Sequence, residues 1–406
     1  MSTEQNNVTH SLNGAEVTLT IESIAFGGFG VARLDGFVIF VPFVLPGETV
    51  EAKILRVKSR FAEATLIKII TPSPERIAAE CQYFSKCGGC AYQHMSYEKE
   101  LDTKSKQIAE LYKQITGKKL TVLDTILPSP QALGYRSKIR MKFKRRRTSS
   151  IFGFFDQDNN QLLDIENCPL ATHRLNQYLT DVRSNDFHFF KTRNTNSFNL
   201  AFLEDGEKVV NNIDDNENLH TEILGKHFYY NRNTFFQINH SIFPPLIEFL
   251  RTLIRDKVPG VHSLMDIYCG VGFFGILLSD LFEQILFLEE NKVSVQFLRK
   301  NVEANGLLFK SQIFCESADK ILKFHSKPVD CVLLDPPRSG VTKEFVQTLQ
   351  ILRPKSVIYI SCNPATQFRD LQWFEEAGFV FTYLKPFDFF PRTKHVETLA
   401  LLQQRS

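Results

Sequence analysis

The feature that most constrains the fold is a series of short apolar runs, separated by helical patterns, in residues 234–406. The runs are Ser263–Tyr268, Ile285–Glu289, Val329–Leu334 and Ser356–Ser361. Each has the length of a buried strand, and polar or glycine residues mark its end. Strands that alternate with helices form a doubly wound parallel sheet, which binds ligands at the carboxyl ends of its strands. The sequence therefore predicts a Rossmann-like α/β domain with its chemistry at those ends.

A different pattern occupies residues 8–70, where short alternating stretches are separated by turn residues. Val17, Leu19 and Ile21 alternate with polar residues, and the apolar run Val38–Val44 precedes a Pro-Gly turn. Several short strands in such a length predict a small β-barrel of the OB type, a common platform for nucleic acids. Any small barrel would have this pattern, so a role in binding nucleic acid needs support from elsewhere in the chain.

That support comes from a basic segment, Arg136–Arg147, in which eight of twelve residues are Lys or Arg and none is acidic. Apolar residues at odd positions alternate with basic residues at even positions, namely Arg136, Lys138, Arg140, Lys142 and Lys144. This period of two predicts a strand with one charged face. A solvated sheet face is the simplest interpretation, but five like charges repel one another unless a polyanion covers them. We therefore expect this strand to contact RNA.

A chain of 406 residues is too long for one core, and these patterns divide it into three domains. We expect a β-barrel in residues 8–70, a central α+β domain in residues 75–233 and the α/β domain in residues 234–406. The central domain contains a helical pattern near Ser96–Thr116. Its acidic and polar stretch Glu204–Glu222 predicts a loop.

The N-terminal residues are polar and no apolar run reaches the length that spans a membrane. We therefore expect a cytoplasmic protein that has no membrane partner. In a reducing compartment, the eight cysteines indicate metal binding, catalysis or burial rather than disulfides.

A glycine motif follows the first strand of the α/β domain. Gly270, Gly272 and Gly275 have the G-x-G-x-x-G spacing, and Glu289 closes the next strand, where it can accept hydrogen bonds from a ribose. A nicotinamide-binding domain and an S-adenosylmethionine-binding methyltransferase share this geometry. The motif alone does not choose between them.

The next two strand ends favour a methyltransferase. The rigid turn Asp335–Pro337 follows the third strand, and Ser361–Pro364 ends the fourth. Carbon 5 of uracil has no lone pair, so its methylation requires a nucleophile at carbon 6, and a thiolate is the natural candidate. We expect Cys362 to be that nucleophile. We expect the other cysteines of this domain to be buried core residues, namely Cys269, Cys315 and Cys331.

A base must then remove the proton from carbon 5 before the thiol can leave. Glu397 introduces the apolar strand Thr398–Leu402, where partial desolvation would raise the pKa of its carboxyl. His395 is the alternative base, although a single histidine is more often structural. We expect Glu397 to be the general base.

Four cysteines in the central domain have the spacing of a metal site. Cys81, Cys87 and Cys90 form C-x5-C-x2-C, and Cys168 comes much later, before a proline. Zinc sites usually pair two short knuckles, so three clustered ligands and one isolated ligand fit a 4Fe–4S cluster better. A radical S-adenosylmethionine enzyme is the rival interpretation, but its three ligands leave one iron open, whereas four would close the cluster. We expect a structural cluster.

Jointly, these motifs resemble the RNA 5-methyluridine methyltransferases that carry an N-terminal TRAM domain, bacterial enzymes acting on tRNA or 23S rRNA. The resemblance covers nearly the whole chain and includes Phe235–Asn239, the glycine motif and Pro391–Glu397. It implies Cys362 as nucleophile, Glu397 as base and a 4Fe–4S cluster. It also implies four contacts to S-adenosylmethionine, from Gln237, Tyr268, Glu289 and Asp335. The position where relatives contact the adenine holds Ser317, so that contact stays unassigned.

The expected activity is therefore S-adenosylmethionine-dependent methylation of uracil carbon 5 in structured RNA, by a monomer that does not act on DNA. The TRAM module favours 23S rRNA over tRNA as the substrate. A nicotinamide-dependent oxidoreductase and a non-catalytic RNA-binding protein are the alternatives. The first leaves the Cys362 turn and the basic strand unexplained, and the second leaves nucleophile and base without a purpose.

Overall fold

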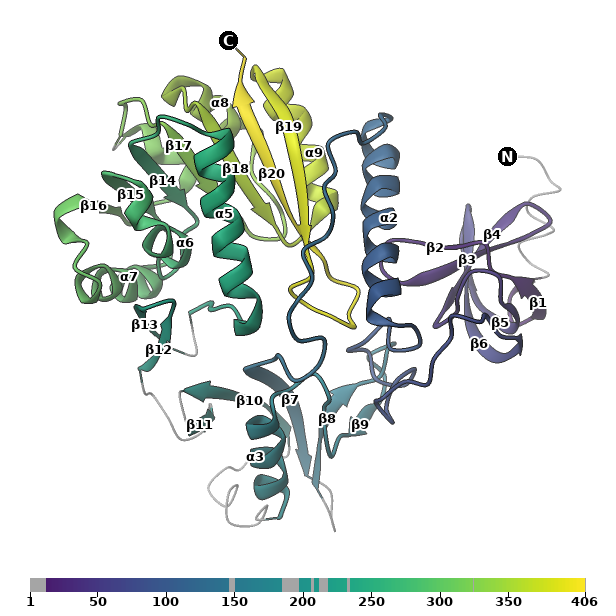
Figure 1. Cartoon of the computed structure of the whole chain (residues 1–406). Coiled ribbons are helices and arrows are strands. Elements are labelled where there is room, and N and C mark those ends of the chain that lie inside the picture. Colours follow the sequence, from purple (N-terminus) through teal and green to yellow (C-terminus); the bar gives the residue numbers. More distant parts are fainter. Residues whose placement is uncertain are drawn as a thin grey trace. The chain divides into compact units, whose positions relative to one another are not determined.

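The computed structural model describes residues 12–145, 150–184, 197–205, 208–211, 218–231, 234–323 and 325–405 (Figure 1). The chain forms two compact units. Unit 1 comprises Met1–Ile108, Lys142–Pro169 and Phe390–Lys394. Unit 2 comprises Ala109–Met141, Leu170–Phe389 and His395–Ser406. The chain therefore passes between the units several times, and each unit is built from segments that are distant in sequence.

Unit 1 begins with a six-stranded sheet, as its alternating pattern predicts. The strands are β1 (Glu16–Thr20), β2 (Ser23–Ile24), β3 (Phe29–Leu34), β4 (Phe37–Pro42), β5 (Thr49–Val57) and β6 (Phe61–Thr71). They lie in the order β1-β5-β6-β4-β3-β2, and all pairs are antiparallel except β4 with β6. Leu19, Ile39 and Val50 are among the side chains that form the core on one face of this sheet.

A buried ion pair fixes the exit from this sheet. Glu48 is fully buried, and its carboxylate accepts hydrogen bonds from Arg76 Nε at 2.5 Å and Nη2 at 2.7 Å. Backbone N–H groups of Leu45 and Ser73 donate to the same carboxylate. Burial alone would raise the pKa of Glu48, but these hydrogen bonds lower it.

The rest of unit 1 contains parts of helix α2 (Tyr97–Thr116), where a helix is predicted, and of strand β7 (Lys138–Arg145). It also contains the short strands β8 (Ser150–Phe155) and β9 (Leu162–Asp164). The boundary between the units falls within α2 and within β7. Residues 142–145 of β7 pair with β8, which pairs with β9.

Unit 2 is organised around a seven-stranded sheet that confirms the doubly wound prediction. Its strands are β14 (Ser263–Ile267), β15 (Gln284–Leu288), β16 (Ser311–Phe314), β17 (Cys331–Leu334), β18 (Ser356–Ser361), β19 (Phe379–Phe387) and β20 (Glu397–Gln404). The order is β16-β15-β14-β17-β18-β20-β19. The first five strands are parallel, whereas β20 is antiparallel to both of its neighbours.

Helices follow the strands in alternation. They are α5 (Phe243–Lys257), α6 (Phe273–Leu277), α7 (Lys292–Ala304), α8 (Lys343–Leu352) and α9 (Pro364–Glu376). Short 3₁₀ turns are η1 (His240–Ile242), η2 (Ser279–Leu281), η3 (Leu308–Lys310) and η4 (Ala318–Lys323). Within the described residues, no helix is long and apolar enough to cross a membrane.

The prediction of a loop over Glu204–Glu222 is wrong for the residues that the structure describes there. Helix α3 (His173–Ser184) precedes four strands: β10 (Ser197–Asp205), β11 (Lys208–Asn211), β12 (Leu219–Ile223) and β13 (Lys226–Tyr230). β10 pairs with β11, and β12 pairs with β13. The prediction rested on the acidic residues and overlooked the apolar ones among and beside them. Of these, Leu203, Val210 and Leu219 are buried. Residues 206–207 and 212–217 of this stretch lie outside the described residues.

Candidate functional site

The predicted site residues of unit 2 lie in one row at the edge of the sheet. Ile267, Leu288 and Leu334 share a register across β15, β14 and β17. The residues that directly follow them are Tyr268, Glu289 and Asp335. Cys362 follows the next strand, β18, and Glu397 begins β20 beside it. Five adjacent strands thus each bring one candidate residue to the same edge.

Cys362 and Glu397 are opposite each other in this row. The last residue of β18, Ser361, pairs with Thr398 of the antiparallel strand β20. One step beyond that pair lie Cys362 on one strand and Glu397 on the other. Burial raises the pKa of the half-buried Cys362 thiol, and the charges of Glu397 and Asp335 raise it further. The thiol is therefore close to both carboxyl groups.

Both carboxyl groups hold a proton more strongly than exposed ones do. Burial raises the pKa of Asp335 to about 7. Glu397 is buried, and burial together with the charge of Asp335 raises its pKa well above the ordinary value. Two carboxyl groups whose pKa values lie above the usual range, beside a thiol, are suited to acid–base chemistry near neutral pH.

Arg338 contributes the positive charge of this group, a role that the sequence analysis did not assign. Its charge lowers the pKa of Cys362 and so opposes the effect of the two carboxylates. The backbone carbonyl of Arg338 accepts hydrogen bonds from Asn363 Nδ2 at 3.0 Å and Thr366 Oγ1 at 3.1 Å. These bonds join the turn after β17 to the turn that carries Cys362. The position of Arg338 directly after Asp335–Pro337 was the available signal.

The glycine motif forms a tight cradle beside this group. Gly270 donates its N–H to Glu289 Oε2 at 2.9 Å, and Gly272 has a φ of 90°. A Cβ atom on Gly275 would lie 2.4 Å from the Phe287 ring and 2.9 Å from Asp266 Oδ2. Only glycine therefore allows this loop to pack over the end of β14. The spacing of the motif predicted this close approach.

Asp266 lies under the glycine loop and was not predicted as a site residue. It is fully buried, and its Oδ2 accepts a hydrogen bond from the N–H of Gly275 at 2.8 Å. Within the described residues, its Oδ1 has no hydrogen-bond partner. Burial, together with the charges of Asp335 and Glu289, raises the pKa of Asp266 to about 8. Acidic groups concentrated around a glycine cradle suit a cationic ligand that carries a ribose.

Gln237 and Tyr268 complete the predicted ligand contacts. Gln237 is buried, and its neighbour Phe236 packs edge-on against Phe273 of α6 at 6.0 Å between ring centroids. Tyr268 has a left-handed backbone with a φ of 62°, and burial raises its pKa. The segment that carries Gln237 therefore lies against the helix that begins after the glycine loop.

The basic segment is a strand with two different faces, as predicted. Ile139, Met141 and Phe143 are buried, whereas Arg140 and Lys144 are exposed. Burial and the charge of Arg140 lower the pKa of the half-buried Lys138 to about 8. Residues 146–149 lie outside the described residues. The alternation places the basic residues of β7 on the face away from its core.

The four predicted metal ligands all belong to unit 1 and are half-buried. The side chain of Gln93 joins two of them, because its Oε1 accepts from the N–H of Cys81 and its Nε2 donates to Cys90 Sγ at 3.3 Å. Burial raises the pKa of Cys81, and the nearby Cys168 raises it further. The isolated Cys168 is thus close to the sequence cluster. Among the described residues, no group of three or more His, Cys, Asp or Glu side chains is placed to hold a metal ion.

The remaining cysteines separate into two environments. Cys269 and Cys331 are buried, which confirms the prediction for them. The same prediction is wrong for Cys315, which is exposed. Cys315 directly follows β16, at the end of an edge strand whose residues are mostly only partly buried. An edge strand has a neighbour on one side only, so its end is open to solvent.

Two family profiles match the chain. The profile described as tRNA (Uracil-5-)-methyltransferase matches residues 197–405, more than half of the chain. The profile of the TRAM domain matches residues 10–67, which contain β1 to β5 and most of β6 in the six-stranded sheet of unit 1.

Similar proteins extend over nearly the full length. An uncharacterized RNA methyltransferase of Aquifex aeolicus is 29% identical and covers 95% of this chain and 98% of its own. One of Synechocystis sp. is also 29% identical and covers 99% of both chains. The solved structure of the Pyrococcus abyssi tRNA (uracil-54, C5)-methyltransferase with S-adenosyl-L-homocysteine superposes with a TM-score of 0.74. It is 24% identical, covers 95% of this chain and 100% of its own, and so has the same fold.

Proposed function

Since the chain belongs to the tRNA (Uracil-5-)-methyltransferase family, we propose that it methylates carbon 5 of a uridine in folded RNA through a covalent bond to Cys362. The chain is an S-adenosylmethionine-dependent RNA methyltransferase with an N-terminal TRAM domain and a C-terminal α/β methyltransferase fold. The observation that carries the covalent mechanism is the placement of Cys362 opposite Glu397 at the end of the β18–β20 pair.

We propose that S-adenosylmethionine binds at the glycine cradle. Glu289 would accept hydrogen bonds from the ribose, and Gln237, Tyr268 and Asp335 would complete the contacts. The cradle fits this ligand because the charges of Glu289 and Asp335 act on Asp266 there, and acidic groups concentrated in this way favour a sulfonium cation. When bound, the ligand supplies an electrophilic methyl group.

The residues of the chain would then act in order. The Cys362 thiolate forms a bond from sulfur to carbon 6, and the electrons of the carbon 5–carbon 6 double bond move toward the carbonyl at carbon 4. Carbon 5 becomes nucleophilic and takes the methyl group. Glu397 removes the proton from carbon 5, the double bond forms again and Cys362 leaves as a thiolate.

A covalent intermediate gives this proposal a direct test. Glu397→Gln keeps the shape of the side chain but cannot take the proton from carbon 5. After methyl transfer, the variant should therefore remain bonded to its RNA in a complex that survives denaturing gel electrophoresis. Normal turnover by Glu397→Gln would remove Glu397 from the role of base, and His395, which is half-buried beside it, would then be the candidate.

For the substrate, we propose 23S rRNA, as the TRAM module and the basic strand favour a large folded RNA. The solved tRNA (uracil-54, C5)-methyltransferase covers 95% of this chain, so tRNA is the alternative substrate. Mapping 5-methyluridine in RNA from a deletion strain separates the two substrates. One position in 23S rRNA should lose its methyl group, whereas loss from tRNA alone would contradict the choice of rRNA.

We further propose that Cys81, Cys87, Cys90 and Cys168 hold a 4Fe–4S cluster. The proposal is supported by three of the thiols, since Gln93 bonds to both Cys81 and Cys90, and Cys168 is close to Cys81. The ligands of a cluster bind different irons and do not converge on a single ion. The bound cluster would have a structural role, joining Cys168 to the loop that carries the other three cysteines.

Anaerobically purified protein should therefore be brown, with broad absorbance near ~400 nm. Cys168→Ser should lose most of the iron, whereas Cys315→Ser, at an exposed cysteine of the other unit, should keep it. Stoichiometric zinc without iron would contradict this proposal.

A further inference from the structure

The connection between the last two strands of unit 2 belongs, in its middle, to unit 1. β19 ends at Phe387 and β20 begins at Glu397, and these two residues are register partners. Between them, residues 390–394 cluster with unit 1, whereas Phe389 and His395 cluster with unit 2. We call residues 390–394 the excursion. The proposed general base therefore lies three residues beyond a segment that a different unit holds.

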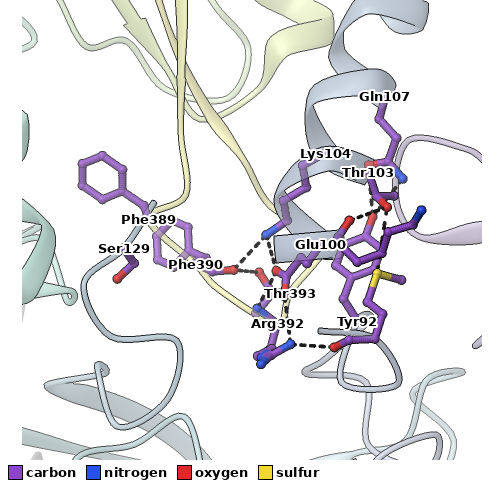
Figure 2. Close-up of polar contacts among 12 residues, drawn as sticks. Tyr92, Glu100, Thr103, Lys104, Gln107, Ser129, Phe389, Phe390, Arg392 and Thr393 are labelled. Carbon is purple, nitrogen blue, oxygen red and sulfur yellow. Dashed lines mark hydrogen bonds and ion pairs between the residues drawn. The ribbon is translucent and has the colours of Figure 1, made fainter. Parts of the chain in front are cut away.

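Backbone and side-chain bonds of Arg392 hold the excursion in unit 1 (Figure 2). Its N–H donates to Glu100 Oε1 at 2.7 Å. Its carbonyl accepts from the N–H of Ala91 at 2.8 Å. Its guanidinium donates to the carbonyl of Met95 at 2.9 Å and lies 3.5 Å from Glu100 Oε2. Arg392 has a left-handed backbone with a φ of 66°, a conformation that these contacts maintain.

Helix α2 supplies buried partners for these bonds. Glu100 is 0% exposed and Lys104, one turn later, is 1% exposed. Lys104 Nζ donates to Glu100 Oε1 at 2.7 Å and to the carbonyl of Phe390 at 3.4 Å (Figure 2). An exposed ion pair between residues four positions apart on a helix contributes little to the free energy of folding. Loss of one partner from a buried ion pair leaves an uncompensated charge, which destabilises the fold much more. This arrangement therefore fixes the excursion strongly.

The excursion is also stiff along its own length. The hydroxyl of Thr393 donates to the carbonyl of Phe390 at 2.8 Å, and its N–H donates to the same atom at 3.2 Å. Beyond it, Val396 is buried and Glu397 enters the β19–β20 ladder. Arg392 is therefore joined to the first residue of β20 by a short segment, part of which is ordered by its own hydrogen bonds.

We propose that Glu100 and Arg392 are positioning residues for Glu397, and that the bonds which hold the excursion set the geometry of proton removal. This inference rests on the proposed role of Glu397 as general base. Glu397 must reach the proton on carbon 5 only after Cys362 has bonded to carbon 6 and the methyl group has been transferred. We call the bonds between Glu100 and Arg392 the tether. Loss of the tether should therefore slow proton removal and product release more than adduct formation and methyl transfer.

The test separates those steps. Glu100→Gln removes the charge that the two cations face, and its RNA should accumulate as a methylated covalent adduct on denaturing gels. Transfer of labelled methyl groups into the adduct should stay close to the wild-type rate, while release of free product falls about tenfold to a hundredfold. Arg392→Lys, which keeps the charge but not the planar guanidinium, should show the same effect more weakly.

Glu48→Gln is the matched control. Glu48 is also fully buried in unit 1 and also pairs with an arginine, Arg76, so its loss destabilises the same unit. The control should lower the unfolding temperature without adduct accumulation. If Glu100→Gln loses methyl transfer and release in equal measure, as a merely destabilised protein would, the positioning role is wrong. The same conclusion follows if Glu100→Gln releases product at the wild-type rate.

Glu397→Gln, assayed in parallel, distinguishes failure of the positioning role from failure of the proposed general base. If it traps an adduct but Glu100→Gln and Arg392→Lys do not, only the positioning role fails. If Glu397→Gln itself turns over normally, the proposed base is wrong and the tether proposal fails with it.

Discussion

Cys362 and Glu397 lie opposite each other where β18 and β20 begin to separate, one step beyond the paired residues Ser361 and Thr398. The antiparallel pairing matters because it brings the end of one strand to the beginning of another. The proposed nucleophile and the proposed base, which are 35 positions apart in the sequence, thereby lie next to each other. Gln367 stabilises this end of the pair, since its Nε2 donates to the carbonyls of Tyr359 at 2.8 Å and Thr398 at 3.2 Å.

Cys362→Ala should abolish methylation and adduct formation while leaving S-adenosylhomocysteine binding unchanged. The substitution removes only the sulfur atom of the side chain. That atom lies at the end of β18, whereas the glycine cradle, where we propose that the ligand binds, follows β14. Calorimetric titration measures the binding, and transfer of labelled methyl groups to RNA measures the activity. Cys315→Ala, at the exposed cysteine of the same unit, should retain both. Residual turnover in Cys362→Ala would contradict covalent catalysis.

The rate of adduct formation should rise with pH across the neutral and mildly alkaline range. Burial and the charges of Glu397 and Asp335 raise the pKa of Cys362, so the thiol is protonated at neutral pH. Below that pKa, the thiolate fraction grows about tenfold per pH unit. Single-turnover rates at a series of pH values measure this slope.

The same pH series with Arg338→Ala tests whether the arginine acts on the Cys362 thiol. Arg338 lowers the pKa of Cys362, so its removal should shift the profile to higher pH and reduce the rate at neutral pH. Arg338→Lys keeps the charge and should retain most of the wild-type profile. Superimposable profiles for wild type and Arg338→Ala would show that the arginine does not act on the thiol.

The framework of unit 2 was predictable from sequence because buried parallel strands have a strong signal. The predicted run Ser356–Ser361 has the bounds of β18. The row at the sheet edge contains the last residues of the first two predicted runs, Tyr268 and Glu289, and the residues that directly follow the next two, Asp335 and Cys362. The proposed roles of Cys362 and Glu397 rest on the chemistry that methylation of carbon 5 requires, and they stay predictions. The loop prediction over Glu204–Glu222 failed because charge was given more weight than the spacing of Leu203, Val210 and Leu219.

The tether could not be predicted from the sequence. Glu100 and Lys104 are an i, i+4 pair on a helix, a pattern typical of a solvated surface. Both are instead buried, and Glu100 bonds to Arg392, which lies 292 residues away in the sequence. Local patterns carry no information about such a partner, and only the folded chain brings it there.

The pH dependence of stability should reveal the buried Asp266. Its folded-state pKa is about 8, whereas an unfolded aspartate has a pKa of about 3.9. Between these values the folded state holds a proton that the unfolded state has lost, so the free energy of unfolding decreases as pH rises from 5 to 8. Asp266→Asn cannot ionise and should flatten this decrease in ligand-free thermal melts. Asp335, whose pKa is raised to about 7, should leave a smaller residual slope.

Asp330→Asn is the control for that measurement. Burial alone would raise the pKa of Asp330, but hydrogen bonds from Lys355 and from the N–H groups of His262 and Ser263 lower it to about 2. Its carboxyl is therefore ionised in both states between pH 5 and 8, and the substitution should lower stability equally at all these values. Equal slopes for wild type and Asp266→Asn would show that Asp266 is ionised in the folded protein.

The exposed basic residues of β7 should determine the salt dependence of RNA binding. Arg140 and Lys144 are exposed and share the face opposite the buried residues Ile139, Met141 and Phe143. Each phosphate contact that is lost should reduce the slope of log Kd against log salt by about 1. The double variant Arg140→Ala/Lys144→Ala should therefore bind RNA more weakly and less steeply with salt, while S-adenosylhomocysteine binding is unchanged. Lys343→Ala removes a basic residue that already pairs with Glu376 at 2.6 Å and should leave the slope intact. A slope that is the same in all three proteins would mean that β7 presents its charges to solvent rather than to RNA.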